Sequence, residues 1–161
     1  SQGYNSSYIY DPSGQYMQLY GDEEYPTTKG SNSGSASGRE GASGGGTIKI
    51  LTHNNLVLNG YIKSDGNHGE MGYNQYGPGG GSGGSIWIDT QILEGTGYCQ
   101  ANGGNGGGST IKRGGGGGGG RLSIYYTNEN TNFNTDLCTV SGGVGRYSIT
   151  EVNRGTARFS Y

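Results

Sequence analysis

The sequence predicts an all-β protein: a parallel β-solenoid of about four short coils with stacked polyglycine runs, preceded by an irregular tyrosine-rich arm. Three observations favour this class. Glycine-rich runs lead three times directly into short apolar strands, over residues 43–50, 77–88 and 114–124. These strands recur at similar spacings along the chain. Their apolar positions alternate, as they do where one face of a strand is buried.

The composition limits the classes of protein to which the chain can belong. Glycine fills 38 of 161 positions, which usually indicates disorder, because few apolar side chains offset the conformational entropy of the backbone. Here the apolar residues are grouped in β-type runs, which argues against full disorder. There is no strict Gly-X-Y period, so collagen is excluded. A net charge of −2 argues against a nucleic-acid partner, and no apolar run reaches membrane-spanning length.

The chain divides into three predicted segments. Residues 1–29 carry six tyrosines among polar residues and are interpreted as an irregular or strand-like arm, with a flexible leader as the alternative. This arm contains one N-glycosylation sequon, at Asn5, as a possible modification site. Residues 30–46 have the composition of a Gly/Ser linker. Residues 47–161 form the predicted glycine-rich β-solenoid domain.

The first strand of each unit defines the predicted core. Equivalent positions continue in the same direction, which favours stacked parallel coils over antiparallel hairpins. The residues between the apolar ones, such as Lys49, Trp87 and Ser123, are predicted on the opposite face. The inward ladder is predicted to comprise Ile50, Ile88, Ile124 and Ile149, with Ile48, Ile86, Leu122 and Tyr147 in the neighbouring row.

A second register lies downstream in each unit. Residues 61–66, 98–103 and 137–142 align, and each segment ends in a turn dipeptide. This alignment places Cys99 and Cys138 at equivalent positions of successive coils, about 5 Å apart between Cα atoms, where a disulfide is possible. Two reduced thiols packed inward are the alternative. The glycine runs are expected to become ordered by stacking, and a flexible loop over residues 104–120 remains the alternative.

Motifs for catalysis, metals or cofactors do not stand out. No lysine follows a glycine, so a phosphate loop is not predicted, and His53 and His68 lack the partners of a zinc site. We therefore predict no catalytic residue, no metal and no cofactor. Trp87, Tyr125 and Tyr126 are the candidates for a surface that contacts sugars or a partner. The alternative is that the arm covers Trp87.

Several segments resemble a glycine-rich repeat of large predicted secreted and surface proteins of bacteria and protists. The resemblance is carried by residues 79–88, 93–97, 101–106 and 114–124. It implies a secreted or surface location and carries no catalytic assignment. The glycine runs are also similar to those of phage tail-fibre adhesins and small antifreeze proteins built on polyglycine-II bundles. The chain departs from both, since apolar strands separate its runs.

The expected function is that of a non-enzymatic extracellular structural protein, a self-assembling subunit of a fibre, sheath or appendage. Its predicted partners are copies of itself, added head to tail through the open ends of the solenoid. The alternative is an adhesin module that binds polysaccharide or a host surface. A β-helical lyase or hydrolase is a third class, disfavoured because the repeats do not align acidic or basic residues.

Overall fold

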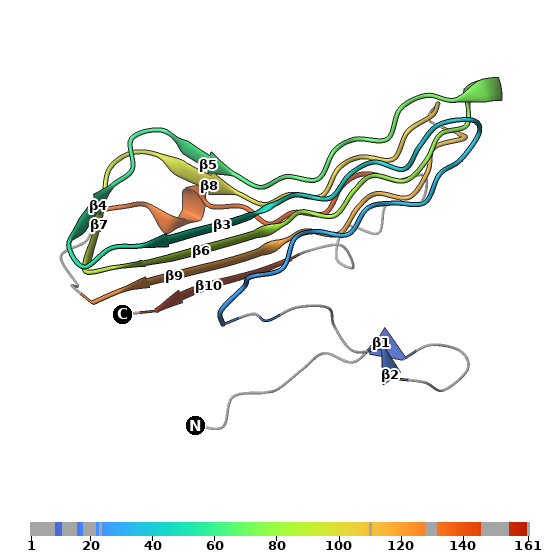
Figure 1. The fold of residues 1–161 in the computed structure, drawn as a ribbon. Helices are drawn as coiled ribbons and strands as arrows, with labels where there is room; N and C mark the ends of the chain where they lie inside the picture. The colour runs from blue at the N-terminus through green and yellow to red at the C-terminus, as the bar shows by residue number, and fades with distance from the viewer. Residues whose placement is uncertain are drawn as a thin grey trace.

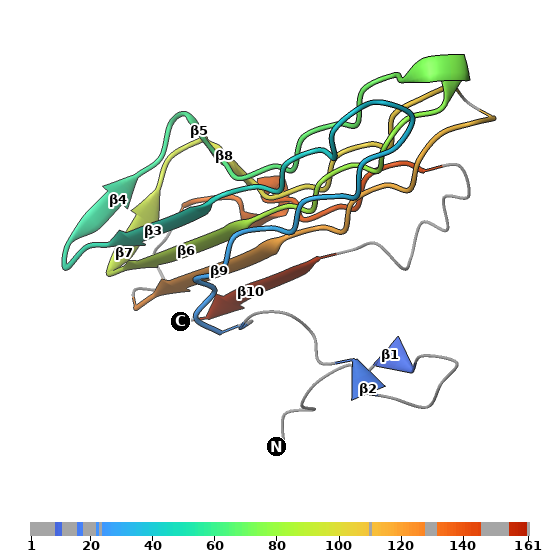
Figure 2. The same cartoon turned by 45° about the vertical axis from the view of Figure 1, so that its right-hand side comes forward.

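The computed structural model describes residues 9–10, 16–17, 22, 24–109, 111–127, 132–145 and 155–160. These residues form short strands and two 3₁₀ turns, which confirms the all-β prediction. The longer strands gather at one end of the molecule. From them, glycine-rich segments run side by side toward the opposite end (Figures 1 and 2).

The main sheet has four parallel strands in the order β10-β9-β6-β3. Strand β6 lies between β3 and β9, and both pairings keep the predicted alignment: Ile50 lies opposite Ile88, and Ile88 lies opposite Ile124. The strands are therefore parallel neighbours and not hairpins. Their bounds are β3 Thr47–Leu51, β6 Ser85–Thr90, β9 Arg121–Tyr126 and β10 Thr156–Ser160.

The fourth strand of this sheet differs from the prediction. In β10, Ala157 lies opposite Leu122 and Phe159 lies opposite Ile124. The positions predicted for this strand, Tyr147 and Ile149, lie outside the described residues. The β10 register keeps the spacing of the repeat nearly constant, because equivalent residues are separated by 38, 36 and 35 positions (86 − 48, 122 − 86, 157 − 122).

We call each stretch of chain from one strand of the main sheet to the next a pass: residues 47–84, 85–120 and 121–155. The first two passes continue through two further parallel pairs, β4 with β7 and β5 with β8. In the described part of the third pass, an isolated bridge joins Thr139 to Gln100 of β8. The bounds are β4 Asn55–Val57, β5 Tyr61–Lys63, β7 Ile92–Glu94 and β8 Tyr98–Gln100. The remaining elements are the antiparallel pair β1 Ile9–Tyr10 and β2 Tyr16–Met17, and the 3₁₀ turns η1 Tyr73–Gln75 and η2 Thr135–Leu137.

The hydrophobic core lies between the inner face of the main sheet and the two smaller pairs. It forms because alternate side chains of each strand point inward and neighbouring passes stack them in rows. Ile48 and Ile50 of the first strand are only partly buried and pack against this core from its edge. The buried core residues are Leu58, Ile86, Ile88, Leu93, Cys99, Ala101, Leu122, Ile124 and Phe133.

The glycine runs are held by backbone hydrogen bonds that recur every third residue. Along the run that precedes β9, the N–H groups of Gly114, Gly117 and Gly120 donate to carbonyls of residues 107, 104 and 101 in the neighbouring run. A spacing of three is the repeat of an extended threefold helix, which has no internal hydrogen bonds and must find partners in adjacent chains. Residues 104–109 and 111–120 are thus tied into a bundle and are not a free loop.

The same threefold repeat decides where glycine is required. In the run 114–120, a Cβ atom would meet open space at Gly115 and at Gly118, and would collide with neighbouring backbone at the other five positions. In the outermost run of the first pass, every third position is instead the crowded one. Glycine occurs at residues 66, 69 and 72, and at each of them a Cβ atom would strike backbone. Glycine is needed wherever a face of the threefold helix packs closely against another run of the same polypeptide.

Residues 30–46, predicted as a linker, belong to this bundle. Gly30 N–H donates to Gly45 O at 2.7 Å, and Gly45 N–H donates to Ser82 O at 2.9 Å. The predicted domain boundary at residue 47 therefore does not separate two parts of the structure. A Gly/Ser-rich composition is typical of a flexible linker, but in this chain it is also the composition that packs against other glycine runs.

Candidate functional site

The outer face of the main sheet contains the predicted contact residue Trp87. Trp87 is half-buried between two neighbours, with Lys49 Nζ 3.9 Å from its ring centroid and the Tyr25 ring 5.2 Å away in an edge-to-face arrangement. Its indole Nε1 is buried and makes no hydrogen bond within the described residues. The structure thus corresponds to the alternative stated above, in which the N-terminal region covers Trp87.

Residues 24–28 form this cover, which we call the strap. Its backbone carbonyls accept hydrogen bonds from side chains of the sheet: Ser123 Oγ and Tyr125 Oη each donate to Glu24 O at 3.0 Å, and Ser85 Oγ donates to Thr28 O at 2.6 Å. The proline between them, Pro26, is fully buried. Ser85 and Ser123 are buried as a result, although they lie on the polar face of the sheet.

A carboxylate fixes the beginning of the strap. Asp22 Oδ1 accepts hydrogen bonds from the backbone N–H groups of Glu24 and Tyr25, at 2.8 and 3.1 Å. The bonds from Tyr25 and then Glu24 hold the pKa of the Asp22 carboxyl below its ordinary value. The negative charge of Glu24 raises the pKa of the Tyr25 phenol. The aromatic ring of Tyr25 also stacks on Tyr125, with ring centroids 6.0 Å apart.

Tyr125 and Tyr126 point to opposite sides of the sheet, because neighbouring residues of a strand alternate. Tyr125 contributes to the covered outer face, as described. Tyr126, which the sequence grouped with it as a surface contact, packs against the hydrophobic core. The three predicted contact residues are therefore not brought together as one exposed platform.

An aromatic pair with one exposed and one half-buried ring lies elsewhere, on the outward side of β5 and β8. The rings of Tyr61 and Tyr98 stack with centroids 5.5 Å apart, and Lys63 Nζ lies 5.1 and 5.4 Å from the two centroids. Tyr61 is 66% exposed. In the sequence, Tyr61 and Tyr98 were recognised only as the first residues of two aligned segments. Their position on the outward side of both aligned strands was the signal that could have identified the pair.

Two hydrogen-bonded ladders continue from this face along the bundle. In one, Asp65 Oδ1 accepts from the backbone N–H of Asn102, and Asn102 Oδ1 accepts from Ser141 N–H, both at 2.7 Å. In the other, His68 Nδ1 accepts from Asn105 N–H at 2.7 Å, and Asn105 Oδ1 accepts from Val144 N–H at 2.8 Å. Each link joins the side chain of one pass to the backbone of the next.

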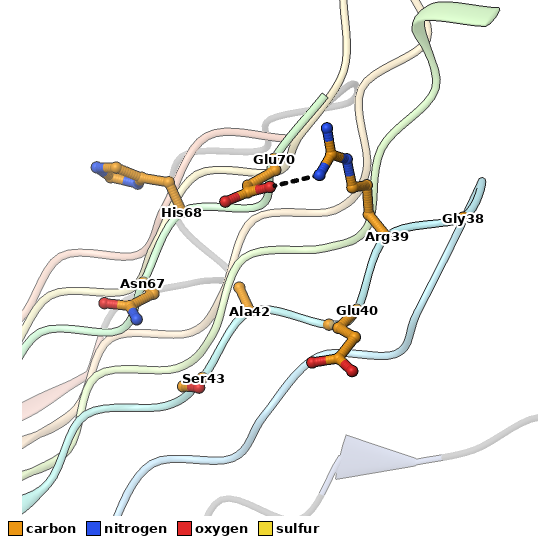
Figure 3. Close-up of a pocket in the computed structure, with 9 residues that line it drawn as sticks. Gly38, Arg39, Glu40, Ala42, Ser43, Asn67, His68 and Glu70 are labelled. Carbon is orange, nitrogen blue, oxygen red and sulfur yellow. Dashed lines mark ion pairs between the residues drawn. The ribbon is translucent and has the colours of Figure 1, made fainter. Parts of the chain in front are cut away.

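A shallow hollow lies between residues 38–43 and residues 67–70 (Figure 3). Arg39 forms an ion pair with Glu70 at 3.2 Å across it, and both side chains are largely exposed. An exposed ion pair contributes little to stability on its own. In the described part of the chain, no group of three or more His, Cys, Asp or Glu side chains is arranged to hold a metal ion.

The two cysteines lie next to each other in neighbouring passes. Thr139 N–H donates to Cys99 O at 2.9 Å, and Ala101 N–H donates to Thr139 O at 3.0 Å, so Cys138 takes the place opposite Cys99. Both thiols are free, with Cys99 buried and Cys138 half-buried. Asn5, the predicted glycosylation site, lies outside the described residues.

No protein-family model, no curated protein and no solved structure matches the chain. In the described residues, no helix combines the length and the apolar character needed to cross a membrane. What the fold itself defines is an all-β chain of parallel strands joined to a glycine bundle.

Proposed function

We propose that the chain is a parallel β-solenoid and a non-enzymatic structural subunit, secreted or held at a cell surface. In this proposal it joins copies of itself head to tail into a fibre, sheath or appendage. The near-constant register of β3, β6, β9 and β10 supports the solenoid, since each pass repeats the same turn of the chain.

The observation that carries the proposal is the pair of edges of the main sheet. Strands β3 and β10 stand at its two edges, and both run in the same direction as the strands between them. An unpaired strand edge is a template for another chain. The β3 strand of a second copy could therefore pair in parallel with β10 and continue the sheet.

The hydrogen-bonding groups at the two edges have matching positions. Thr156 N–H donates to Gly120 O at 3.1 Å, as Arg121 N–H does to Gly84 O at 2.9 Å. Residues of a parallel strand turn alternately to its two neighbours, so Ala157 and Phe159 of β10 present their backbone groups to the free edge. By the same alternation, Lys49 of β3 faces its own free edge. The contact is heterologous, and it propagates unless the rotation between copies closes a ring.

A proline at the free edge tests this proposal. Ala157→Pro removes an N–H that points away from β9, whereas Ala157→Ser keeps it at the same position. We expect the wild-type protein and Ala157→Ser to form long assemblies at micromolar concentration, seen by sedimentation velocity and electron microscopy. Ala157→Pro should remain a monomer of about 17 kDa. A wild-type protein that never assembles, or an Ala157→Pro variant that assembles equally well, would refute the edge contact.

One observation favours the second candidate, a polysaccharide-binding module. The stacked Tyr61–Tyr98 pair, with Tyr61 exposed and Lys63 beside it, combines aromatic surface and a cation, features that can stack on and hydrogen-bond to sugar rings. If this candidate is correct, Tyr61→Ala should lose binding on a glycan array. Trp87→Phe, altered beneath the strap, should retain it. A wild-type protein that binds no glycan argues for the structural role alone.

A further inference from the structure

The two cysteines lie where the strand ladder formed by β5 and β8 gives way to an isolated bridge. Strands β5 and β8 are joined by a ladder of three residue pairs. On the other side of β8, the described part of the third pass joins it through an isolated bridge, between Gln100 and Thr139, and backbone bonds such as Gly103 N–H to Ser141 O continue from there into the glycine bundle. The segment that arrives there comes from η2, at which no residue is buried. A cross-link at this point would join the second and third passes where no regular strand of the third pass is described.

The backbone arrangement brings the two thiols within bonding range. Cys99 and Cys138 are opposite each other on adjacent parallel segments, so their side chains leave on the same side. Adjacent strands are about 4.8 Å apart, and a disulfide tolerates roughly 4.4–6.8 Å between Cα atoms. Both residues contact the hydrophobic core, which keeps their rotamers restricted.

The two cysteines are not equivalent. Cys99 is 0% exposed, whereas Cys138 is half-buried. The hydrogen bond between the two thiols raises the pKa of Cys99, with burial adding to the effect, and lowers the pKa of Cys138. The accessible residue is thus also the one that more readily forms the thiolate, the nucleophile in thiol–disulfide exchange.

We propose that Cys99 and Cys138 are a redox modification site, in which a small disulfide such as oxidised glutathione enters at Cys138 and a Cys99–Cys138 bond results. The Cys138 thiolate attacks one sulfur of the small disulfide, forming a mixed disulfide and releasing one thiolate. Cys99 then loses its proton and attacks the Cys138 sulfur, releasing the second thiolate. The two protons go to the two released thiolates, so one disulfide is exchanged for another and no further oxidant is needed.

The bond would join the second and third passes covalently. It closes a loop of 39 residues (138 − 99). In the chain-entropy model, a loop of this length in a protein of this size corresponds to a rise in Tm of about 8–16 °C if the bond is unstrained. This inference concerns the chemistry of one folded chain and does not depend on the proposed assembly or location.

The test uses the full chain, fully reduced and then incubated natively with oxidised glutathione. We expect the wild-type protein to lose both titratable thiols and two hydrogen atoms of mass without forming dimers, and to melt at a higher temperature than its reduced form. Cys99→Ser should accumulate one glutathione adduct at Cys138, while Cys138→Ser should keep its thiol free. The double variant Cys99→Ser/Cys138→Ser is the control, with a Tm unaffected by glutathione.

Three results would overturn the proposal. If the wild-type protein retains two free thiols after treatment, or forms only intermolecular disulfides, the intramolecular bond is refuted. Equal reactivity of the two single variants would refute entry at Cys138. The thiol count is made after unfolding in denaturant with an alkylating reagent, so that burial of Cys99 is not mistaken for oxidation.

Discussion

Substitution by alanine at two adjacent glycines of the run 114–120 should change the stability of the protein in opposite directions. At Gly117, a Cβ atom would lie less than 3 Å from the carbonyl carbon and oxygen of Gly81. At Gly118, a Cβ atom would meet nothing within 4 Å. The two positions are adjacent in the same unbroken run of glycines and differ in what a Cβ atom would meet. A comparison between them therefore isolates the effect of close chain approach.

The magnitudes follow from the two environments. At Gly117 the atom in the way is backbone, held by the bundle, so Gly117→Ala should destabilise the protein by about 1–3 kcal/mol or more. Gly118 does not have a positive φ, so alanine can adopt its backbone conformation. Gly118→Ala should therefore stabilise by about 0.4–1 kcal/mol, chiefly by reducing the conformational freedom of the unfolded chain.

The assay is urea-induced unfolding followed by tryptophan fluorescence, since Trp87 is the single tryptophan of the chain. The transition midpoint should fall for Gly117→Ala and rise for Gly118→Ala at an unchanged slope. Gly115→Ala, the second open position of the run, is the matched control and should behave like Gly118→Ala. If Gly117→Ala and Gly118→Ala shift the midpoint by the same amount, the threefold packing of the run is wrong.

Two other features give predictions of the same kind. Ile88 is fully buried between Ile50 and Ile124, so Ile88→Ala should lower the free energy of unfolding in urea by about 2–5 kcal/mol. Asp89→Ala, at an exposed position, should change it by no more than about 0.5 kcal/mol. Equal effects of the two substitutions would contradict the inward row of isoleucines. Tyr25→Ala should uncover Trp87, with a red-shifted emission and stronger quenching by acrylamide, and an unchanged spectrum would argue against the strap. Because the pKa of Asp22 is lowered in the folded state, the stabilisation that its carboxylate provides is complete above the ordinary pKa of 3.8. This stabilisation is lost as the pH falls through the lower pKa of the folded state. Acid titration should therefore loosen the strap below that pH in the wild-type protein, while Asp22→Asn shows no such transition in Trp87 fluorescence.

The register of the first three strands of the main sheet could be predicted because a period of two and a repeat of 36–38 residues coincide there. The alternation Ile86-Trp87-Ile88 assigns each side chain to one face, and a slip by one residue would reverse it. The alignment of Cys99 with Cys138 followed from the same reasoning. It was predictable because the turn dipeptides at the ends of these segments fixed their phase.

The fourth strand was predicted elsewhere, at Tyr147 and Ile149, on a spacing that shortens to 25 residues (147 − 122). A constant spacing was the better guide: 35 residues beyond Arg121 lies Thr156, the first residue of β10. That the arm covers Trp87 was stated as an alternative, but the way the strap docks could not be predicted, since it uses backbone carbonyls that carry no side-chain signature. Its one sequence signal is Tyr25-Pro26, an aromatic residue followed by a proline that becomes buried.

The Asn102 and Asn105 ladders also determine how the protein could be lengthened. The second pass, residues 85–120, both donates to the side chains of the pass before it and accepts from the backbone of the pass after it. Val144 donates its backbone N–H to Asn105 Oδ1, but its side chain has no polar atom that could accept the next bond. A tandem duplication of residues 85–120 would therefore insert a module whose two faces fit each other. A duplication of the third pass would break the chain of bonds at its valine. Growth of such a protein by gene duplication, or by design, is favoured from its middle.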